Sequence, residues 1–237
     1  MMPRDDDLRF DPDAPLGPKF WSTGPVDDRR RVRDASIRPL NSICRLIAPG
    51  PLLGSGTVIA RRAILTAGHN LQGVAHTRWH IDQGFNQTPQ YYPLKGAREF
   101  PHPRWSGARD PNFDIGLVAL AEDAPTSFPS SVVSEDDADA SIYVCGYSLD
   151  DPNFQRFDVG SLTNAEGNVA GHTCDTAPGQ SGSPVLAYDN NSTRLIGVHV
   201  YGYAELDDLF PGPVNKAVLL VPEIVEWIDG ILQGSEN

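Results

Sequence analysis

A serine inside a glycine-rich turn is the first candidate for chemistry. Residues Gly179–Val185 read GQSGSPV. A serine hydroxyl is inert at neutral pH unless a base takes its proton and backbone amides stabilise the oxyanion that forms. Gly179 can adopt backbone angles closed to other residues, so the amides of Gly179 and Ser181 can face one pocket beside the Ser181 hydroxyl. Taken alone, such a sequence is equally typical of a plain surface turn.

A base and a carboxylate are available elsewhere in the chain. His69 closes the apolar run AILTAGH, so a strand end can hold it rigidly, and Asp114 opens the apolar run DIGLVAL. A carboxylate hydrogen-bonded to an imidazole holds it in the tautomer that a general base needs. Taken alone, Asp114 is more typical of a strand or turn cap, and Asp110 is its nearest rival. A single histidine is also more often structural, and the chain offers His76, His80 and His102 as well.

The order of the candidate base, carboxylate and serine along the chain distinguishes among the known classes of serine hydrolase. His69, Asp114 and Ser181 occur in the order His, Asp, Ser and are spread over both halves of the chain. The α/β-hydrolase order is Ser, Asp, His with a GxSxG elbow, and here Ser183 stands where that elbow needs its second glycine. The subtilisin order begins with Asp. Neither of these arrangements fits the sequence.

Cysteine chemistry has less support. Cys174 lies two residues after His172 in GHTCD, but no oxyanion turn adjoins it, and two residues on one strand face do not place their reactive atoms well. Only three cysteines are present, and their spacing matches no zinc motif. Buried small side chains are the main interpretation, and a Cys145–Cys174 disulfide stays open.

Short strands and one helix must position these residues. The 22 glycines and 21 prolines among 237 residues favour turns and an all-β fold. We expect an N-terminal arm or propeptide at residues 1–25, a strand-rich unit at residues 26–125 carrying His and Asp, and another at residues 126–237 carrying Ser. A Pro- and acid-rich connector at residues 121–140 separates the halves, and helical apolar spacing appears only at residues 221–233.

Charge narrows the range of partners. The net charge is −12, and the pI is near 4.8. A nucleic-acid-binding protein normally presents a basic face, and an anionic membrane attracts basic segments, so both partners are disfavoured. The first residues, MMPRDDDLRFDPDAP, contain no apolar segment typical of a signal peptide. The sequence therefore predicts a cytoplasmic protein, or a secreted one if a leader has been removed.

Three blocks together resemble a known family. LTAGH at residues 65–69, DIGLV at residues 114–118 and GQSGSPV are similar to the catalytic blocks of trypsin-like serine proteases of the chymotrypsin fold. GQSGSPV and VDDRRRV at residues 26–32 resemble the glutamyl endopeptidase, or V8-like, branch more closely. The resemblance covers about residues 26–235. It implies two six-stranded antiparallel β-barrels, followed by a C-terminal helix.

The resemblance also implies roles for individual residues. Ser181 would be the nucleophile, His69 the general base and Asp114 the group that orients it, while the amides of Gly179 and Ser181 would form the oxyanion hole. In the glutamyl branch, residues at the positions of Thr176 and His199 contact the acidic side chain of the substrate. A hydroxyl and an imidazole can hydrogen-bond a carboxylate, and a protonated imidazole would also pair with it electrostatically. A barrel histidine bonded only to its neighbours is an equal alternative for His199.

Further expectations concern partners and regulation. The resemblance implies protein or peptide substrates, no cofactor and no metal. Branch members are usually zymogens, so residues before about Val26 would form a propeptide removed by an activating protease; regulation by a partner protein is the alternative. Asn70 departs from the pattern, because many relatives carry a cysteine directly after the base. The competing hypothesis for function is a catalytically inactive binding module on a protease fold.

Overall fold

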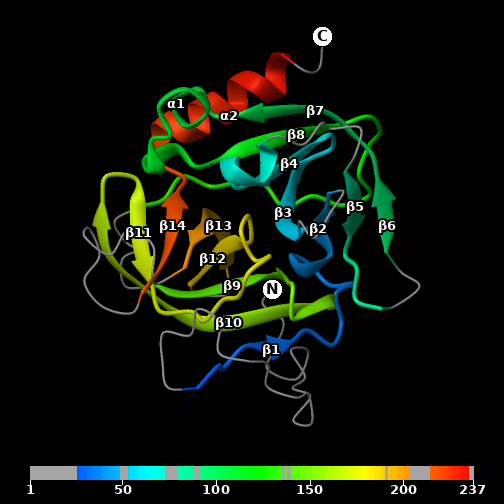
Figure 1. Cartoon of the computed structure of the whole chain (residues 1–237), viewed down its shortest axis with the longest axis vertical. Helices are drawn as coiled ribbons and strands as arrows, with labels where there is room; N and C mark the ends of the chain where they lie inside the picture. The colour runs from blue at the N-terminus through cyan, green and yellow to red at the C-terminus, as the bar shows by residue number, and fades with distance from the viewer. Residues whose placement is uncertain are drawn as a thin grey trace.

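The fold is built from two antiparallel sheets. The structure is a computed structural model. It describes residues 26–48, 53–72, 79–87, 91–134, 137, 140–189, 192–202 and 214–234. In Figure 1 the first sheet lies at the upper right and the second at the lower left. The expected arm at residues 1–25 and His76 lie outside the described residues.

The first sheet carries seven strands among the described residues. Their order across the sheet is β6 (Tyr92–Leu94), β5 (His80–Gln83), β2 (Ile43–Ile47), β3 (Leu53–Ala60), β4 (Ala63–Thr66), β8 (Gly116–Leu120) and β7 (Gly96–Pro101). The two edge strands, β6 and β7, are separated in the chain only by Lys95. Counted as one bent strand, they close the sheet into the expected six-stranded barrel.

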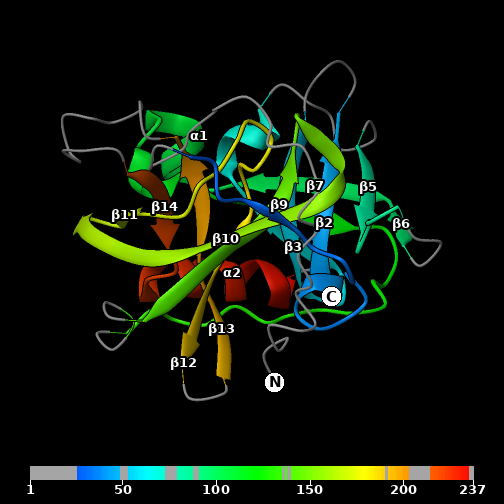
Figure 2. The same ribbon diagram turned by 90° about the horizontal axis from the view of Figure 1, so that it is seen from below.

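The second sheet also carries seven strands among the described residues. Their order is β1 (Arg30–Arg31), β10 (Asp151–Glu166), β11 (Val169–His172), β14 (Asn215–Leu219), β13 (Ser192–Tyr201), β12 (Pro184–Asp189) and β9 (Ser141–Ser148). A further pairing of β9 with β10 closes a ring of six strands, as expected. The seventh strand, β1, lies along the outside of β10, and Figure 2 shows it beside that long, curved strand.

The pairing of β1 differs from the domain division expected from the sequence. Residues from 26 onward were expected in the first unit, yet Arg30 and Arg31 pair with Phe157 and Arg156 of the second sheet. The physical reason is that charged side chains of this segment pair with Asp150 and Asp151, where the chain turns from β9 into β10. No apolar stretch in VDDRRRV draws it into the first barrel.

The core explains why the strand sequences are continuously apolar. Along β4, Ile64 packs into one cluster, while its neighbours Ala63 and Leu65 pack into another. The cluster that contains Ala63 and Leu65 includes residues of both sheets, and it also includes Ile224 and Ile228 of α2 (Pro222–Gly234). Successive strand residues point to opposite faces, so a strand buried on both faces is apolar throughout. Figure 1 shows α2 beside β7 and β8, and the helix predicted at residues 221–233 is confirmed.

No helix among the described residues is long and apolar enough to cross a membrane. The other helical segments named in the described part of the chain are short: α1 (Pro103–Ala108) and the 3₁₀ turns η1 (Leu40–Ser42), η2 (Gly68–Leu71) and η4 (Pro111–Phe113). Two of these turns, η2 and η4, stand at neighbouring strand ends and position the candidate base and carboxylate.

Candidate active site

Strand register brings His69 and Asp114 together. β4 ends at Thr66, which pairs with Gly116 at the start of β8. His69 lies in η2, just after β4, and Asp114 follows η4, just before β8, so both residues occupy the same edge of the sheet. Gly68 is required here, because a Cβ at this position would lie 2.6 Å from Cδ1 of Trp105.

The Asp114 carboxylate contacts His69 through both oxygens. Oδ2 lies 2.7 Å from Nδ1 of His69, and Oδ1 accepts a hydrogen bond of 2.7 Å from the His69 amide. Asp114 is fully buried, whereas 30% of the His69 side chain is exposed. A carboxylate accepts only, so it places the ring proton on Nδ1 and leaves Nε2 as the basic nitrogen. This is the arrangement a general base needs.

The rival residues have other partners. Asp110 caps η4, with Oδ1 accepting from the Asn112 amide at 3.0 Å and Oδ2 accepting from Arg104 at 2.6 Å. His80 is exposed and pairs with Asp82. The ring of His102 accepts from the Arg104 amide at the start of α1 and stacks on Phe113. None of these contacts reaches His69.

The turn that carries Ser181 depends on glycines with positive φ. Gly179 has φ of 100° and Gly182 has φ of 89°, values in the region that favours glycine. A Cβ on Gly182 would lie 2.0 Å from the Ser55 carbonyl oxygen and 2.3 Å from Oγ1 of Thr66. The turn therefore packs directly on β3 and β4 of the first sheet, the strands that precede the base.

Hydrogen bonds connect the turn that carries Ser181 with the residues around His69. The Ser181 carbonyl oxygen accepts hydrogen bonds of 2.8 Å from the Ser55 amide and from Nδ2 of Asn70. Asn70 directly follows His69 and also donates to Oγ1 of Thr66. Oγ of Ser55 donates to the Gly179 carbonyl oxygen at 3.2 Å. These contacts place the Ser181 turn against the residues that flank His69.

A small cavity adjoins the serine. Its volume is about 220 Å³, and it is lined by Ala177, Pro178, Gly179, Ser181, His199, Val200 and Gly202. His199, one of the two residues predicted to contact substrate, therefore lines the cavity beside Ser181. Thr176, the other residue predicted to contact substrate, is fully buried and is not among the lining residues. Its hydroxyl has no hydrogen-bond partner among the described residues.

His199 belongs to a buried histidine pair. Its Nδ1 lies 3.1 Å from Nε2 of His172, and both rings are buried. Burial, together with the charge of Lys216, lowers the pKa of His172 to about 3. Burial and the neighbouring rings of His172 and His69 hold the pKa of His199 well below its ordinary value. His199 is therefore neutral at pH 7, which corrects the idea of a protonated His199: it can offer a hydrogen bond but no positive charge.

The cysteines take no part in this site. Cys44, Cys145 and Cys174 are all buried free thiols, so the open question of a Cys145–Cys174 bridge is answered in the negative. Burial raises the pKa of the Cys174 thiol, which disfavours the reactive thiolate. Among the described residues, no group of three or more His, Cys, Asp or Glu side chains is arranged to hold a metal ion.

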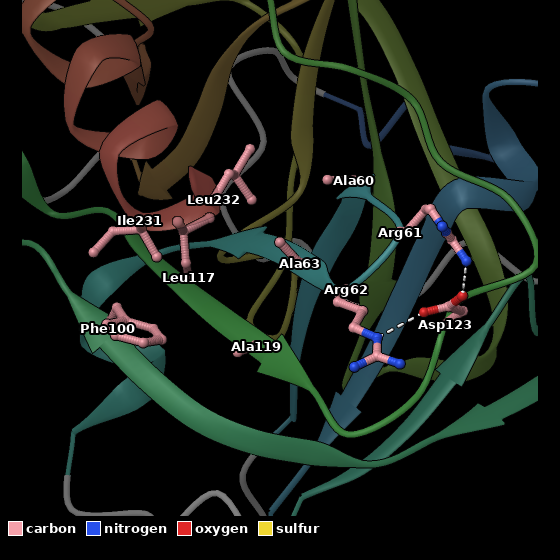
Figure 3. Close-up of a pocket in the computed structure, with 10 residues that line it drawn as sticks. All are labelled: Ala60, Arg61, Arg62, Ala63, Phe100, Leu117, Ala119, Asp123, Ile231 and Leu232. Carbon is pink, nitrogen blue, oxygen red and sulfur yellow. Dashed lines mark hydrogen bonds and ion pairs between the residues drawn. The ribbon is translucent and has the colours of Figure 1, made fainter. Parts of the chain in front are cut away.

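A larger cavity lies elsewhere, beside the C-terminal helix. Its volume is about 660 Å³, and Ile231 and Leu232 of α2 line it with residues of the first sheet (Figure 3). At its other end Arg61 and Arg62 both pair with Asp123. None of the predicted site residues lines it. We therefore place the candidate active site at the smaller cavity beside Ser181.

The structural roles of three residues around the site were missed from the sequence: Ser55, Asn70 and Gln180. Each acts through hydrogen bonds to segments far away in the chain, for example Ser55 to Gly179 and Asn70 to Ser181. The only available signal was the position of Asn70 and Gln180, each directly beside a predicted catalytic residue.

Comparison with known proteins identifies the family of the chain. The family model described as trypsin-like peptidase domain matches residues 54–198. A glutamyl endopeptidase of Bacillus licheniformis is 25% identical over 182 residues, covering 72% of this chain and 56% of its own length. One from Staphylococcus aureus strain MW2 is 25% identical over 211 residues, covering 83% of this chain and 60% of its own length. This chain thus spans less than two thirds of these relatives.

A solved structure shows the same fold. The structure of a Glu endopeptidase in complex with MPD superposes with a TM-score of 0.75 at 23% identity, covering 86% of this chain and 96% of that one. The matched family residues run from β3 to β13 and include His69, Asp114 and Ser181. The chain belongs to the family of trypsin-like peptidase domains.

Proposed function

We propose that the chain is a serine endopeptidase with His69, Asp114 and Ser181 as its catalytic triad. The observation that carries this proposal is the pair of 2.7 Å contacts from the buried Asp114 carboxylate to His69, on the face against which the Ser181 turn packs. Family membership supports the same reaction class.

The reaction follows from these positions. Nε2 of His69 takes the Ser181 hydroxyl proton while Oγ attacks the scissile carbonyl carbon. The amides of Gly179 and Ser181 stabilise the oxyanion, and the protonated His69 then gives its proton to the leaving amine. An acyl-enzyme remains on Ser181, and water, deprotonated by His69, releases the second product. Asp114 keeps Nδ1 protonated and stabilises the imidazolium.

A fluorophosphonate probe tests the nucleophile. We expect it to label the wild-type protein at Ser181, and Ser181→Ala to abolish both labelling and peptide hydrolysis. Ser106→Ala is the control, because Ser106 is an exposed serine of α1 outside the site. Labelling retained by the Ser181→Ala variant would overturn the proposal. Failure of labelling and proteolysis in the wild type, with tight binding of a protein partner, would favour the inactive binding module.

We further propose that the cavity beside Ser181 accepts an acidic side chain, so cleavage follows Glu or Asp. His199 is its imidazole donor. If Nε2 of His172 donates to Nδ1 of His199, the ring proton of His199 lies on Nε2, the nitrogen that would donate to a substrate carboxylate. The curated relatives are named for glutamyl cleavage, which supports this assignment. Thr176 is buried and does not line this cavity, so it is not part of the proposed carboxylate site.

Profiling with a peptide library tests this preference. We expect cleavage after Glu, and more weakly after Asp, to exceed cleavage after the neutral isostere Gln. Gln is the matched comparison because it has the same length without the charge. A clear preference for Arg or for large apolar residues would reject the proposed preference and leave the serine endopeptidase assignment intact.

A further inference from the structure

An arginine near the start of the described residues, Arg29, is buried beside the turn that carries Ser181. Arg29 is 2% exposed. Its guanidinium pairs with Asp27 at 2.6 Å and with Asp150 at 2.7 Å. Burial works against its charge, but hydrogen bonds to Asp27 and Asp150 outweigh this and raise the pKa of Arg29 above its ordinary value. Arg29 is thus a fixed cation that two carboxylates hold in one orientation.

The same guanidinium contacts the residue directly before the nucleophile. Nη1 of Arg29 donates to Oε1 of Gln180 at 3.2 Å, and the Ala177 amide donates to the same oxygen at 2.9 Å. Gln180 is fully buried. Two donors converge on this atom, so the amide oxygen rather than the nitrogen must face them. The Gln180 side chain therefore ties the start of the turn to Arg29.

Other contacts connect the same segments. The Asp28 amide donates to Oδ2 of Asp175 at 3.0 Å, and the Leu149 amide donates to the Pro178 carbonyl oxygen at 2.7 Å. Besides the contacts that Ser55 makes with Gly179 and Asp158 makes with Asp175, residues 175–180, which lead into Ser181 and form part of the cavity wall, are held at three further points. Two of those points, at Asp28 and Arg29, come from the N-terminal segment. The third comes from the neighbour of Asp150.

We propose that Arg29 is a positioning residue for the turn that carries Ser181 and that it acts through Gln180. This inference rests on the proposed serine endopeptidase function. The backbone between Ala177 and Ser181 carries the Gly179 and Ser181 amides, so its conformation decides whether both amides point at the oxyanion. Arg29 fixes the Gln180 side chain, which in turn fixes the Ala177 amide. The contact with Gln180 comes from the Arg29 side chain and not from an amino terminus. It therefore does not require removal of a propeptide before Val26.

Steady-state kinetics of Arg29 variants test this role in the full chain. For Arg29→Gln we expect kcat to fall about 10- to 100-fold, with KM within about 3-fold, because oxyanion stabilisation operates only in the transition state. The affinity for a peptide boronate, which places an anionic oxygen in the oxyanion hole, should fall in parallel. Arg29→Lys should recover part of the loss, since an ammonium group also donates to Gln180.

Arg31→Gln is the matched control. Arg31 lies on β1, pairs with Asp151 at 2.6 Å and is partly exposed, so its substitution removes a similar ion pair two residues away. We expect its kcat to stay within about 2-fold of wild type. Rates are expressed per mole of fluorophosphonate-reactive sites, which excludes unfolded protein from the comparison.

Gln180→Met isolates the proposed route, because it leaves the Arg29 ion pairs intact. If Arg29 acts through Gln180, adding Arg29→Gln to Gln180→Met lowers kcat little further, since residues in one network are not additive. Independent, multiplicative losses would overturn the proposal. So would an Arg29→Gln protein that is less stable to urea yet has wild-type kcat per active site. A wild-type protein that fails to label would instead refute the proposed function.

Discussion

Two histidine segments contact the turn that carries Ser181, and the surroundings of the two side chains differ. His69 is held by a buried carboxylate and keeps 30% of its side chain exposed. His199 is 3% exposed, and its ring partner is another imidazole, His172, rather than an acid. A base must take and give back a proton, so it needs a nearby negative charge to stabilise its cationic form. Burial disfavours the charged form of an imidazole, so His199, which has no acidic ring partner, stays neutral and can act only as a hydrogen-bond donor or acceptor.

The two histidine segments also hold the serine turn in different ways. On the His199 side the contacts are backbone ones: the Gly182 amide donates to the His199 carbonyl oxygen, and the His199 amide donates to that of Ser183. On the His69 side the Asn70 side chain makes the contact with the Ser181 carbonyl oxygen. Substitution of the His199 side chain should therefore spare the turn, whereas substitution near His69 should disturb it.

The largest effect is expected from removing the carboxylate of the first pair. In Asp114→Asn the amide would donate to Nδ1 of His69 and shift the ring proton to Nε2, so the base would be lost. We expect kcat to fall about 10⁴-fold, a magnitude taken from the trypsin family rather than deduced from this chain. Asp110→Asn is the control, since its carboxylate caps η4 without touching His69. The reverse ranking of these two variants would refute the assignment of Asp114.

The second largest effect concerns His199. His199→Leu removes the proposed donor to the substrate carboxylate. A hydrogen bond to a charged group contributes roughly 1.5–3 kcal/mol, so kcat/KM for a Glu substrate should fall about 10- to 100-fold. An otherwise identical Ala substrate is the internal control and should change less than about 3-fold, because the turn is held by His199 backbone atoms. Equal losses on both substrates would show that His199 supports the fold rather than the specificity.

Apolar runs and frequent turn residues predicted an all-β fold from local sequence, and the resemblance of three blocks to a known family implied the two-barrel architecture. Apolar runs buried on both faces mark β4 and β8, and GQSGSPV contains the glycines that its turn requires. The pairing of His69 with Asp114 was implied by the resemblance of LTAGH and DIGLV to the catalytic blocks of trypsin-like serine proteases. The triad roles themselves stay predictions until Ser181 is tested.

The contacts that hold the site together could not be read from the sequence. Arg29 and Gln180 are 151 residues apart, and Asn70 and Ser181 are 111 apart. Asparagine and glutamine carry no periodic pattern, and only the three-dimensional register shows which carbonyl or guanidinium they meet. The neutrality of His199 was likewise hidden, because it depends on burial and on His172, a strand residue 27 positions earlier.

A smaller effect is expected at Asn70. Asn70→Ala removes the side-chain donor to the Ser181 carbonyl oxygen and to Oγ1 of Thr66. A neutral hydrogen bond contributes about 1 kcal/mol net, so we expect kcat to fall about 5- to 10-fold while the enzyme stays folded. Asn70→Asp is the sharper variant, because a carboxylate near the Ser181 carbonyl oxygen can only repel it. A wild-type kcat in both variants would show that the Ser55 amide alone holds the turn.

The last effect is on stability, and its pH dependence tests whether the His172–His199 pair is neutral. The folded pKa of His172 is about 3, whereas an unfolded histidine titrates near 6.5. Between these values the unfolded chain binds the proton and the folded chain does not, so the free energy of unfolding falls as pH falls below about 6.5. The slope contributed by His172 is up to about 1.4 kcal/mol per pH unit. His172→Gln removes this titration.

Asp158 acts in the opposite direction and sharpens the measurement. Burial is the main cause that raises its pKa to about 6, and the nearby charges of Asp175 and Asp28 add to it. The folded chain therefore binds this proton more readily than the unfolded chain, and the stability it contributes is lost as pH rises through about 6. Urea unfolding at pH 7 and pH 5 should show a larger loss on acidification in Asp158→Asn than in wild type. The loss in His172→Gln should be smaller than in wild type, and a His172→Gln protein that loses as much as wild type would contradict the neutral, buried pair.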